Sequence, residues 1–261
     1  MPGSTHRLQA NFSLSIGKEF PSIAGLQSMC FFGTGYDGIE SNRVAGGPAL
    51  VTRGSPVHAS NYVSLGMRAG GTQFDTIDLN CPRDASWIAS GWTGMACVRA
   101  TTAYGTGNYV TVFSDQNSGS ASPGQGGSVT GIGLQFSNNR LVVYRNGINN
   151  TANLQLVNAQ NWHIVGYTVP ATAAIGLQTV GWDFTDNQAG QSVAATLTGT
   201  LLVPNPAMSP HLGTDSTDNA LGQGMIDCSW SMLAKAVLTQ SAMAAIAASA
   251  RAWLSRRLIT A

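Results

Sequence analysis

Short apolar runs separated by turn-forming residues dominate the chain from Ser28 onward. The runs are rich in Val, Ile, Thr, Tyr and Phe, and most of them alternate apolar and polar positions with a period of two. Clusters of Gly, Asn, Ser and Pro separate them at intervals of about ten residues, which is typical of an all-β sandwich or barrel. The predicted strands are Asn61–Leu65, Gln73–Leu79, Gly94–Thr101, Tyr109–Ser114, Ile132–Phe136, Arg140–Arg145, Trp162–Val169, Gly176–Asp183, Val193–Val203 and Met225–Val237.

One segment, residues 240–258, has a helical period instead. Its apolar residues fall on one face, and Thr239 precedes it as an N-cap. Basic residues toward its end suit the negative end of the helix dipole. The apolar face consists of Met243, Ile246, Ala250, Trp253 and Leu254, and the basic residues are Arg251, Arg256 and Arg257.

The first 25 residues differ from the rest, because they mix Pro, Gly, Ser and polar residues with a brief alternation at Phe12, Leu14 and Ile16. They predict an arm that pairs either with another chain or with its own domain. The expected organisation is therefore an N-terminal arm at residues 1–25 with an assembly role, and one β-sandwich domain at residues 26–261. Residues 116–128 predict a loop, and Asn146-Gly147 predicts a tight hairpin turn.

Charge is sparse, at 10% of residues with a net charge of +1, so the chain has no basic field for nucleic acid. No stretch is long and apolar enough to span a bilayer, and the N-terminus lacks the apolar region of a signal peptide, which predicts no membrane insertion and no secretion of its own. The four cysteines have no CxxC spacing and are expected to be reduced core residues. The scattered histidines predict no metal site and no cofactor.

Several segments, taken in order, resemble the concanavalin A-like jelly roll in its laminin-G/pentraxin-like form, especially as found in tailed-phage virion proteins. The segments are Gly54-Ser55-Pro56 with Asn61–Leu65, Gly94–Arg99, Gly133–Asn139 leading into Arg140–Arg145, Asn161–Val165 with its Trp-His-x-Val, and Ile226–Val237 followed by Leu238-Thr239 and the closing helix. The chain departs from this pattern at Ala242, where the family has Glu, and at Asp227-Cys228-Ser229, where it has Phe-x-Gly.

The resemblance implies an antiparallel jelly-roll β-sandwich with one C-terminal α-helix, an all-β fold. It also implies a virion protein, assembled in the bacterial host cytoplasm, that decorates a capsid or forms part of a tail appendage. The expected partners are other virion proteins, further copies of the chain and a glycan of the host surface. Some family members hold a calcium ion, and only the segment Asp183–Asn187 offers acidic groups of that kind here.

Glycanases of this fold need two carboxylates about 5–10 Å apart. The only glutamates, Glu19 and Glu40, precede the recognisable strands, and Asp75 and Asp78 lie on opposite faces of one strand. No G-x-S-x-G is present, and His163 is most simply a strand residue. The sequence therefore predicts no catalytic residues and no enzymatic activity.

A sugar-binding domain needs aromatic rings for the faces of the sugar and polar groups for its hydroxyls. The predicted ligand-binding residues near turns are Tyr104, Asn108, Trp182, Asp183, Asp186 and Asn187. They are expected to be solvated loop positions whose replacement leaves the thermal melt nearly unchanged. Three alternatives stay open: these residues plug the core and close turns, the chain is a cellular lectin-like module, or it is a glycan-degrading enzyme.

Overall fold

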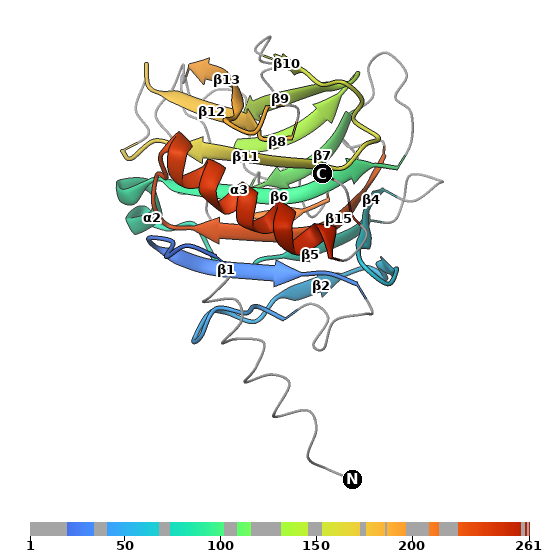
Figure 1. The fold of residues 1–261 in the computed structure, drawn as a ribbon. Coiled ribbons are helices and arrows are strands. Elements are labelled where there is room, and N and C mark those ends of the chain that lie inside the picture. The colour runs from blue at the N-terminus through green and yellow to red at the C-terminus, as the bar shows by residue number, and fades with distance from the viewer. Residues whose placement is uncertain are drawn as a thin grey trace, which may run out of the picture.

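The structure is a computed structural model that describes residues 20–33, 41–67, 74–101, 109–115, 132–145, 153–172, 176–185, 187–196, 209–213, 224–256, 259 and 261. Its strands pair antiparallel throughout these ranges and form two packed layers with a helix on the outside (Figure 1). The fold is all-β, an antiparallel jelly-roll β-sandwich with one long helix close to the C-terminus. The sequence pattern predicted this fold class, and the structure confirms it.

The layer beneath the helix, which we call the helix-side sheet, has its longest strand at its centre. It comprises β1 (Leu26–Phe31), β3 (Val57–His58), β4 (Val63–Met67), β15 (Met225–Ala234), β6 (Trp92–Ala100), β11 (His163–Val169), β12 (Gln178–Asp183) and β13 (Gln191–Thr196). β15 pairs with β6 along one side and with β4 and then β1 along the other.

The second layer, the opposite sheet, packs face to face on the first. It comprises β10 (Asn153–Gln155), β9 (Arg140–Arg145), β8 (Ile132–Ser137), β7 (Tyr109–Ser114), β14 (His211–Leu212), β5 (Phe74–Asp78) and β2 (Val51–Arg53). The pairing of β4 with β5 joins the two layers at one side. At Gly181 on β12 the layers approach so closely that a Cβ atom would lie 2.6 Å from Cγ2 of Val143.

The central strands of the helix-side sheet are buried on both faces. On β6, Trp92, Ala96 and Val98 enter the core between the sheets, whereas Met95 and Cys97 enter a second core beneath the helix. Each strand therefore contributes to two hydrophobic cores, because successive side chains point to opposite faces. This explains why β6 is apolar at nearly every position rather than at every second one.

A β-bulge at Ser229 reverses the alternation of faces along β15. The register of β15 against β6 jumps from Cys228 to Trp230. As a result Cys228 faces the core between the sheets, while Trp230 faces the helix. Asp227, before the bulge, keeps its place on the outer face, where it pairs across the strands with Arg99 and Ser64.

The helix α3 (Gln240–Ser255) begins where the sequence predicts it and lies across β11, β6 and β15 (Figure 1). The hydroxyl of Thr239 accepts a hydrogen bond from the Ala242 amide at 3.2 Å, so Thr239 is the N-cap, as predicted. The helix ends three residues before the predicted Leu258. All five residues of the predicted apolar face are buried.

Arg251 has a different role from the one expected. It lies before the last turn of α3, and its guanidinium donates from Nη2 to the Phe184 carbonyl at 2.6 Å and from Nε to the Ala261 carbonyl at 3.0 Å. It therefore ties the helix to the loop after β12 rather than acting on the helix terminus. Arg257 lies outside the described residues.

Most predicted strands are present, with ends displaced by one to a few residues. Six elements were not predicted. They are β1, the short strands β2, β3, β10 and β14, which have only two or three residues, and the short helix α2 (Ala85–Ser90), which Asp84 caps. The predicted loop at 116–128, the Asn146-Gly147 turn and the last part of the strand predicted to end at Val203 lie outside the described residues. All four cysteines are buried and free of disulfides, as predicted.

The end of the predicted N-terminal arm packs on the domain. Phe20 is 7% exposed, and its ring stacks on Trp230 with centroids 6.0 Å apart and meets the ring of Phe31 edge-on at 6.1 Å. The segment therefore contacts the sandwich from residue 20 onward. An assembly role for residues 1–19, which lie outside the described ranges, stays a prediction.

Candidate functional site

Three of the six predicted ligand-binding residues can be placed. Tyr104, Asn108 and Asp186 lie outside the described residues, whereas Trp182 and Asp183 end β12 and Asn187 follows in the next turn. Trp182 is partly buried and stacks on Phe184, with centroids 6.1 Å apart and an interplanar angle of 17°. It lines the outer hydrophobic core rather than presenting a free ring.

Asp183 is fully buried, which corrects the expectation that it is a solvated loop residue. Strand alternation turns its side chain toward the interior, where Oδ1 lies 3.2 Å from Nδ1 of His163 and also accepts from the Thr185 amide. His163 is 1% exposed, and its ring packs 6.0 Å from that of Phe136 on the opposite sheet. This buried pair is a structural feature that the sequence analysis did not anticipate.

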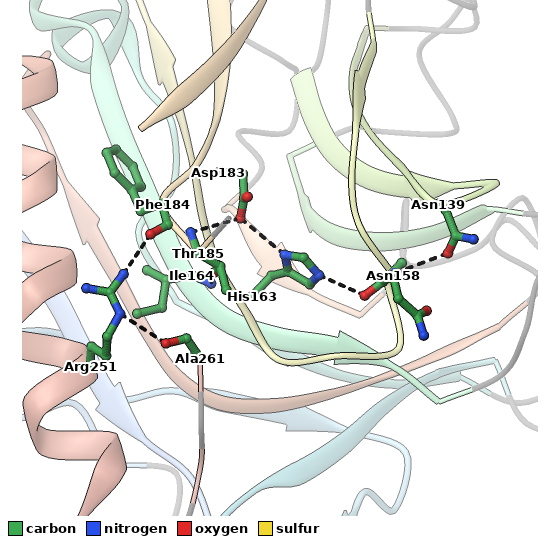
Figure 2. Close-up of polar contacts among 10 residues, drawn as sticks. Asn139, Asn158, His163, Ile164, Asp183, Phe184, Thr185, Arg251 and Ala261 are labelled. Atoms are coloured by element: carbon green, nitrogen blue, oxygen red, sulfur yellow. Dashed lines mark hydrogen bonds and ion pairs between the residues drawn. The ribbon is translucent and has the colours of Figure 1, made fainter. Parts of the chain in front are cut away.

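Both nitrogens of the His163 ring have partners (Figure 2). Nε2 lies 2.9 Å from the Asn158 carbonyl, and the neighbouring Ala159 amide donates to Oδ1 of Asn139 at 3.1 Å. An ionised Asp183 and the Asn158 carbonyl are both acceptors, an arrangement that suits a ring donating from both nitrogens. The pair therefore ties the loop at 158 to the end of β12.

Asn187 is exposed, and its Oδ1 accepts from the Ala189 amide at 3.0 Å, which closes the turn. A surface hollow of about 570 Å³ lies beside this turn and the first turn of α3, lined by Ala189, Thr239, Gln240, Ser241 and Ala244. The lining contains no aromatic ring and no charge. Within the described part of the predicted region, no freely exposed aromatic ring lies beside a polar group.

Such a combination occurs elsewhere on the outer face of the helix-side sheet. A pocket of about 450 Å³ is lined by Tyr62, Ser64, Arg99, Ala100, Thr101, Gln160 and Asp227, and we call it the Arg99 pocket. The Arg99 guanidinium donates from Nε to Oδ2 of Asp227 at 2.9 Å, and its Nη2 forms an ion pair with the same oxygen, also at 2.9 Å. The other oxygen of Asp227 accepts from the Ser64 hydroxyl at 2.6 Å.

Two aromatic rings flank the guanidinium of this pocket. The Cζ atom of Arg99 lies 5.3 Å from the ring centroid of Tyr62 and 4.9 Å from that of Trp162. The two rings are 5.8 Å apart and tilted by 58°. Both rings are partly exposed, so they hold Arg99 by cation–π contact and still reach the surface.

Strand register brings the polar residues of the pocket together. Asp227 on β15 lies opposite Ser64 on β4 and opposite Arg99 on β6, so the three side chains share one face. Tyr62 and Trp162 come directly before β4 and β11. Thr101 forms the rim, and the predicted loop residues Tyr104 and Asn108 follow it in the chain.

Sequence reasoning missed this pocket because its residues come from four separate segments. One signal was visible, since Asp227 stands at one of the two positions where the chain departs from the family pattern. A charged residue within an otherwise apolar strand requires a partner, and that partner is Arg99.

Among the residues the structure describes, no group of three His, Cys, Asp or Glu side chains is placed to hold a metal ion. None of the described helices is long and apolar enough to cross a membrane.

The fold resembles that of solved proteins at low sequence identity. Trypanosoma rangeli sialidase in complex with sialic acid matches with a TM-score of 0.60 and 11% identity over 98% of this chain. The binding domain of botulinum neurotoxin DC in complex with SialylT matches with a TM-score of 0.52 and 9% identity over 84% of this chain. This chain covers only 39% of the sialidase chain and 50% of the neurotoxin chain.

At these identities the similarity establishes the fold alone. It supports the β-sandwich, jelly-roll-like architecture that the resemblance implied, and it carries no link to phage virions. No protein-family model matches the sequence, and no curated protein matches it.

Proposed function

We propose that this protein is a non-enzymatic glycan-binding module and that the Arg99 pocket is its sugar-binding site. The observation that carries the proposal is the position of the partly exposed Tyr62 ring in the lining of one surface pocket, beside an ordered set of polar groups and 5.8 Å from the ring of Trp162. Aromatic rings bind the apolar faces of sugars, and nearby polar groups bind the hydroxyls. The two structural matches are, by their titles, proteins in complex with sialic acid and with SialylT, and they lend the proposal weak support.

A binding role is favoured over hydrolysis by how the described carboxylates are used. Asp115, Asp183 and Asp227 each pair with a cationic side chain. Asp75 accepts from the Ser55 amide, Asp78 lies near Arg53, and Asp84 caps α2. A glycosidase needs one carboxyl group that stays protonated to act as an acid, and none of these described groups is left for that role.

In the second part of the proposal, the protein is a structural component of a phage particle, either a capsid decoration or part of a tail appendage, and is present there in several copies. Its support is the order of the segments that resemble phage jelly-roll domains. A single pocket of this size would bind a sugar weakly, and repetition on a particle would raise the overall affinity by avidity. Immunogold labelling of purified particles tests this part separately from sugar binding.

The binding proposal is tested with a glycan array of bacterial surface oligosaccharides, followed by titration of the hits by calorimetry. We expect Tyr62→Ala to weaken binding about tenfold, since a lost ring contact of about 1.4 kcal/mol corresponds to that factor in Kd. The matched control is Gln240→Ala in the hollow beside α3, which should bind as the wild type does. Binding that is insensitive to Tyr62→Ala, or the steady appearance of new reducing ends, would overturn the proposal.

A further inference from the structure

The charges that line the Arg99 pocket neutralise each other. We infer that the pocket selects an uncharged sugar and discriminates against sugars that bear a carboxylate. This inference rests on the proposed function and specifies its ligand class. The two solved complexes that share the fold contain, by their titles, sialic acid and SialylT, so the inference also sets this site apart from them.

The ion pair is compact and largely withdrawn from water on its acidic side. Two guanidinium nitrogens of Arg99 lie 2.9 Å from one oxygen of Asp227, whose side chain is only 5% exposed, whereas that of Arg99 is 35% exposed. An incoming anion would be attracted by the guanidinium and repelled by the carboxylate 2.9 Å from it. Because the two contributions are opposite in sign and arise at nearly the same place, little net attraction remains.

The remaining hydrogen-bonding capacity fits hydroxyl groups better than a carboxylate. The Ser64 hydroxyl donates a hydrogen bond to Asp227, and the Thr101 hydroxyl donates one to the Met225 carbonyl at 3.0 Å. Both oxygens can therefore only accept from a ligand. Nη1 of Arg99 has no hydrogen-bond partner among the residues the structure describes, so its N–H groups are available to a ligand. A guanidinium nitrogen can only donate.

A ligand in this pocket must both donate and accept hydrogen bonds. A sugar hydroxyl does both, whereas a carboxylate has no proton to give and would face the acceptor oxygens of Ser64, Thr101 and Asp227. The partly exposed ring of Tyr62, which lines the pocket, complements this arrangement, because an aromatic ring contacts the C–H groups of a pyranose without regard to charge. The balanced charge of the pocket, its need for both a donor and an acceptor, and its aromatic ring therefore all favour an uncharged sugar.

The test compares neutral and acidic oligosaccharides in pairs: a glucose disaccharide and its glucuronic acid counterpart, which differ only in the carboxylate, and lactose and 3′-sialyllactose, which differ in one acidic sugar residue. Binding is followed by saturation-transfer NMR and calorimetry. We expect the wild type to prefer the neutral member of each bound pair by about tenfold or more. Its affinity should change less than about twofold between about 50 and 500 mM NaCl, because no net charge is neutralised.

Asp227→Asn provides the decisive variant, because it keeps the side-chain size while leaving the Arg99 charge uncompensated. We expect it to shift the acidic-to-neutral preference about tenfold toward the acidic member and to make that binding salt-sensitive. Asp78→Asn, which removes the same charge on the opposite sheet, is the matched control and should leave the preference unchanged. If Asp227→Asn does not fold, the matched pairs and the salt series on the wild type decide the question.

The outcomes separate the inference from the proposed function. Tighter binding of the acidic members by the wild type, or a fall of more than about tenfold in affinity at high salt, overturns the inference and leaves glycan binding in place. An unchanged preference in folded Asp227→Asn also overturns it. Failure to bind any glycan, on the array or among the matched pairs, overturns the proposed function itself.

Discussion

Replacing Asp183 tests whether the buried His163–Asp183 pair stabilises the fold. In Asp183→Ala the ring of His163 keeps its buried position but loses the acceptor 3.2 Å from Nδ1, and the Thr185 amide loses a hydrogen bond as well. Removal of one partner from a buried charged pair costs about 3–5 kcal/mol, because the other charge stays buried without compensation.

The expected change in melting temperature follows from the size of the chain. With about 2.1 cal/mol/K of unfolding entropy per residue, 261 residues give about 0.55 kcal/mol/K, so the Tm should fall by about 5–9 °C. Asn187→Ala is the matched control, since it removes one exposed turn hydrogen bond from the same region and should shift the Tm by less than about 2 °C. Calorimetry and urea titration measure both variants.

A second variant distinguishes the loss of pairing from the loss of packing. His163→Phe combined with Asp183→Leu removes both members of the pair, and it should cost less than the sum of the single changes, because no buried charge is left. The reasoning is refuted if Asp183→Ala melts within about 2 °C of the wild type or if the single and double variants are additive.

Two further predictions concern the hydrophobic cores. Burial raises the pKa of the Cys30 and Cys81 thiols to about 12, and it raises the pKa of the Cys97 and Cys228 thiols well above the usual value. At pH 8 iodoacetamide should therefore modify none of the four cysteines in the folded protein and all four after denaturation. Modification of the native protein without unfolding would show that a thiol is accessible. Phe20→Ala should lower the free energy of unfolding by about 3 kcal/mol, whereas deletion of residues 1–18 should leave it nearly unchanged, as measured by urea titration. A deletion that costs as much as Phe20→Ala would assign residues 1–18 to the core.

Local sequence pattern predicted much of the fold because it acts over short distances. The period of two marks the strands, and the spacing of Met243, Ile246 and Ala250 with an N-cap at Thr239 marks the helix. Such patterns report which face of an element is buried. They do not report what covers it, which is why the two-sided burial of β6 and the packing of Phe20 emerged only in the structure.

The sequence predicted which kinds of side chain the candidate site contains, but not which residues form it. The sequence indicated that rings and polar groups near turns would recognise a ligand, and it singled out Trp182 and Asp183. In the structure Trp182 faces a hydrophobic core and Asp183 a buried histidine, while Tyr62, Ser64, Arg99 and Asp227 line the pocket. Whether a polar residue at a strand end faces water or the interior depends on the neighbouring strands, and the residue itself does not determine it.

By itself the sequence determined the all-β class, the closing helix, the reduced buried cysteines and the scarcity of charge, because these follow from composition and from periodicity within one element. The tertiary structure alone decided that Trp230 turns toward the helix after the bulge at Ser229, and that Asp227, before the bulge, pairs with Arg99. The register between strands far apart in the chain sets that pairing, and register depends on how both layers pack at once.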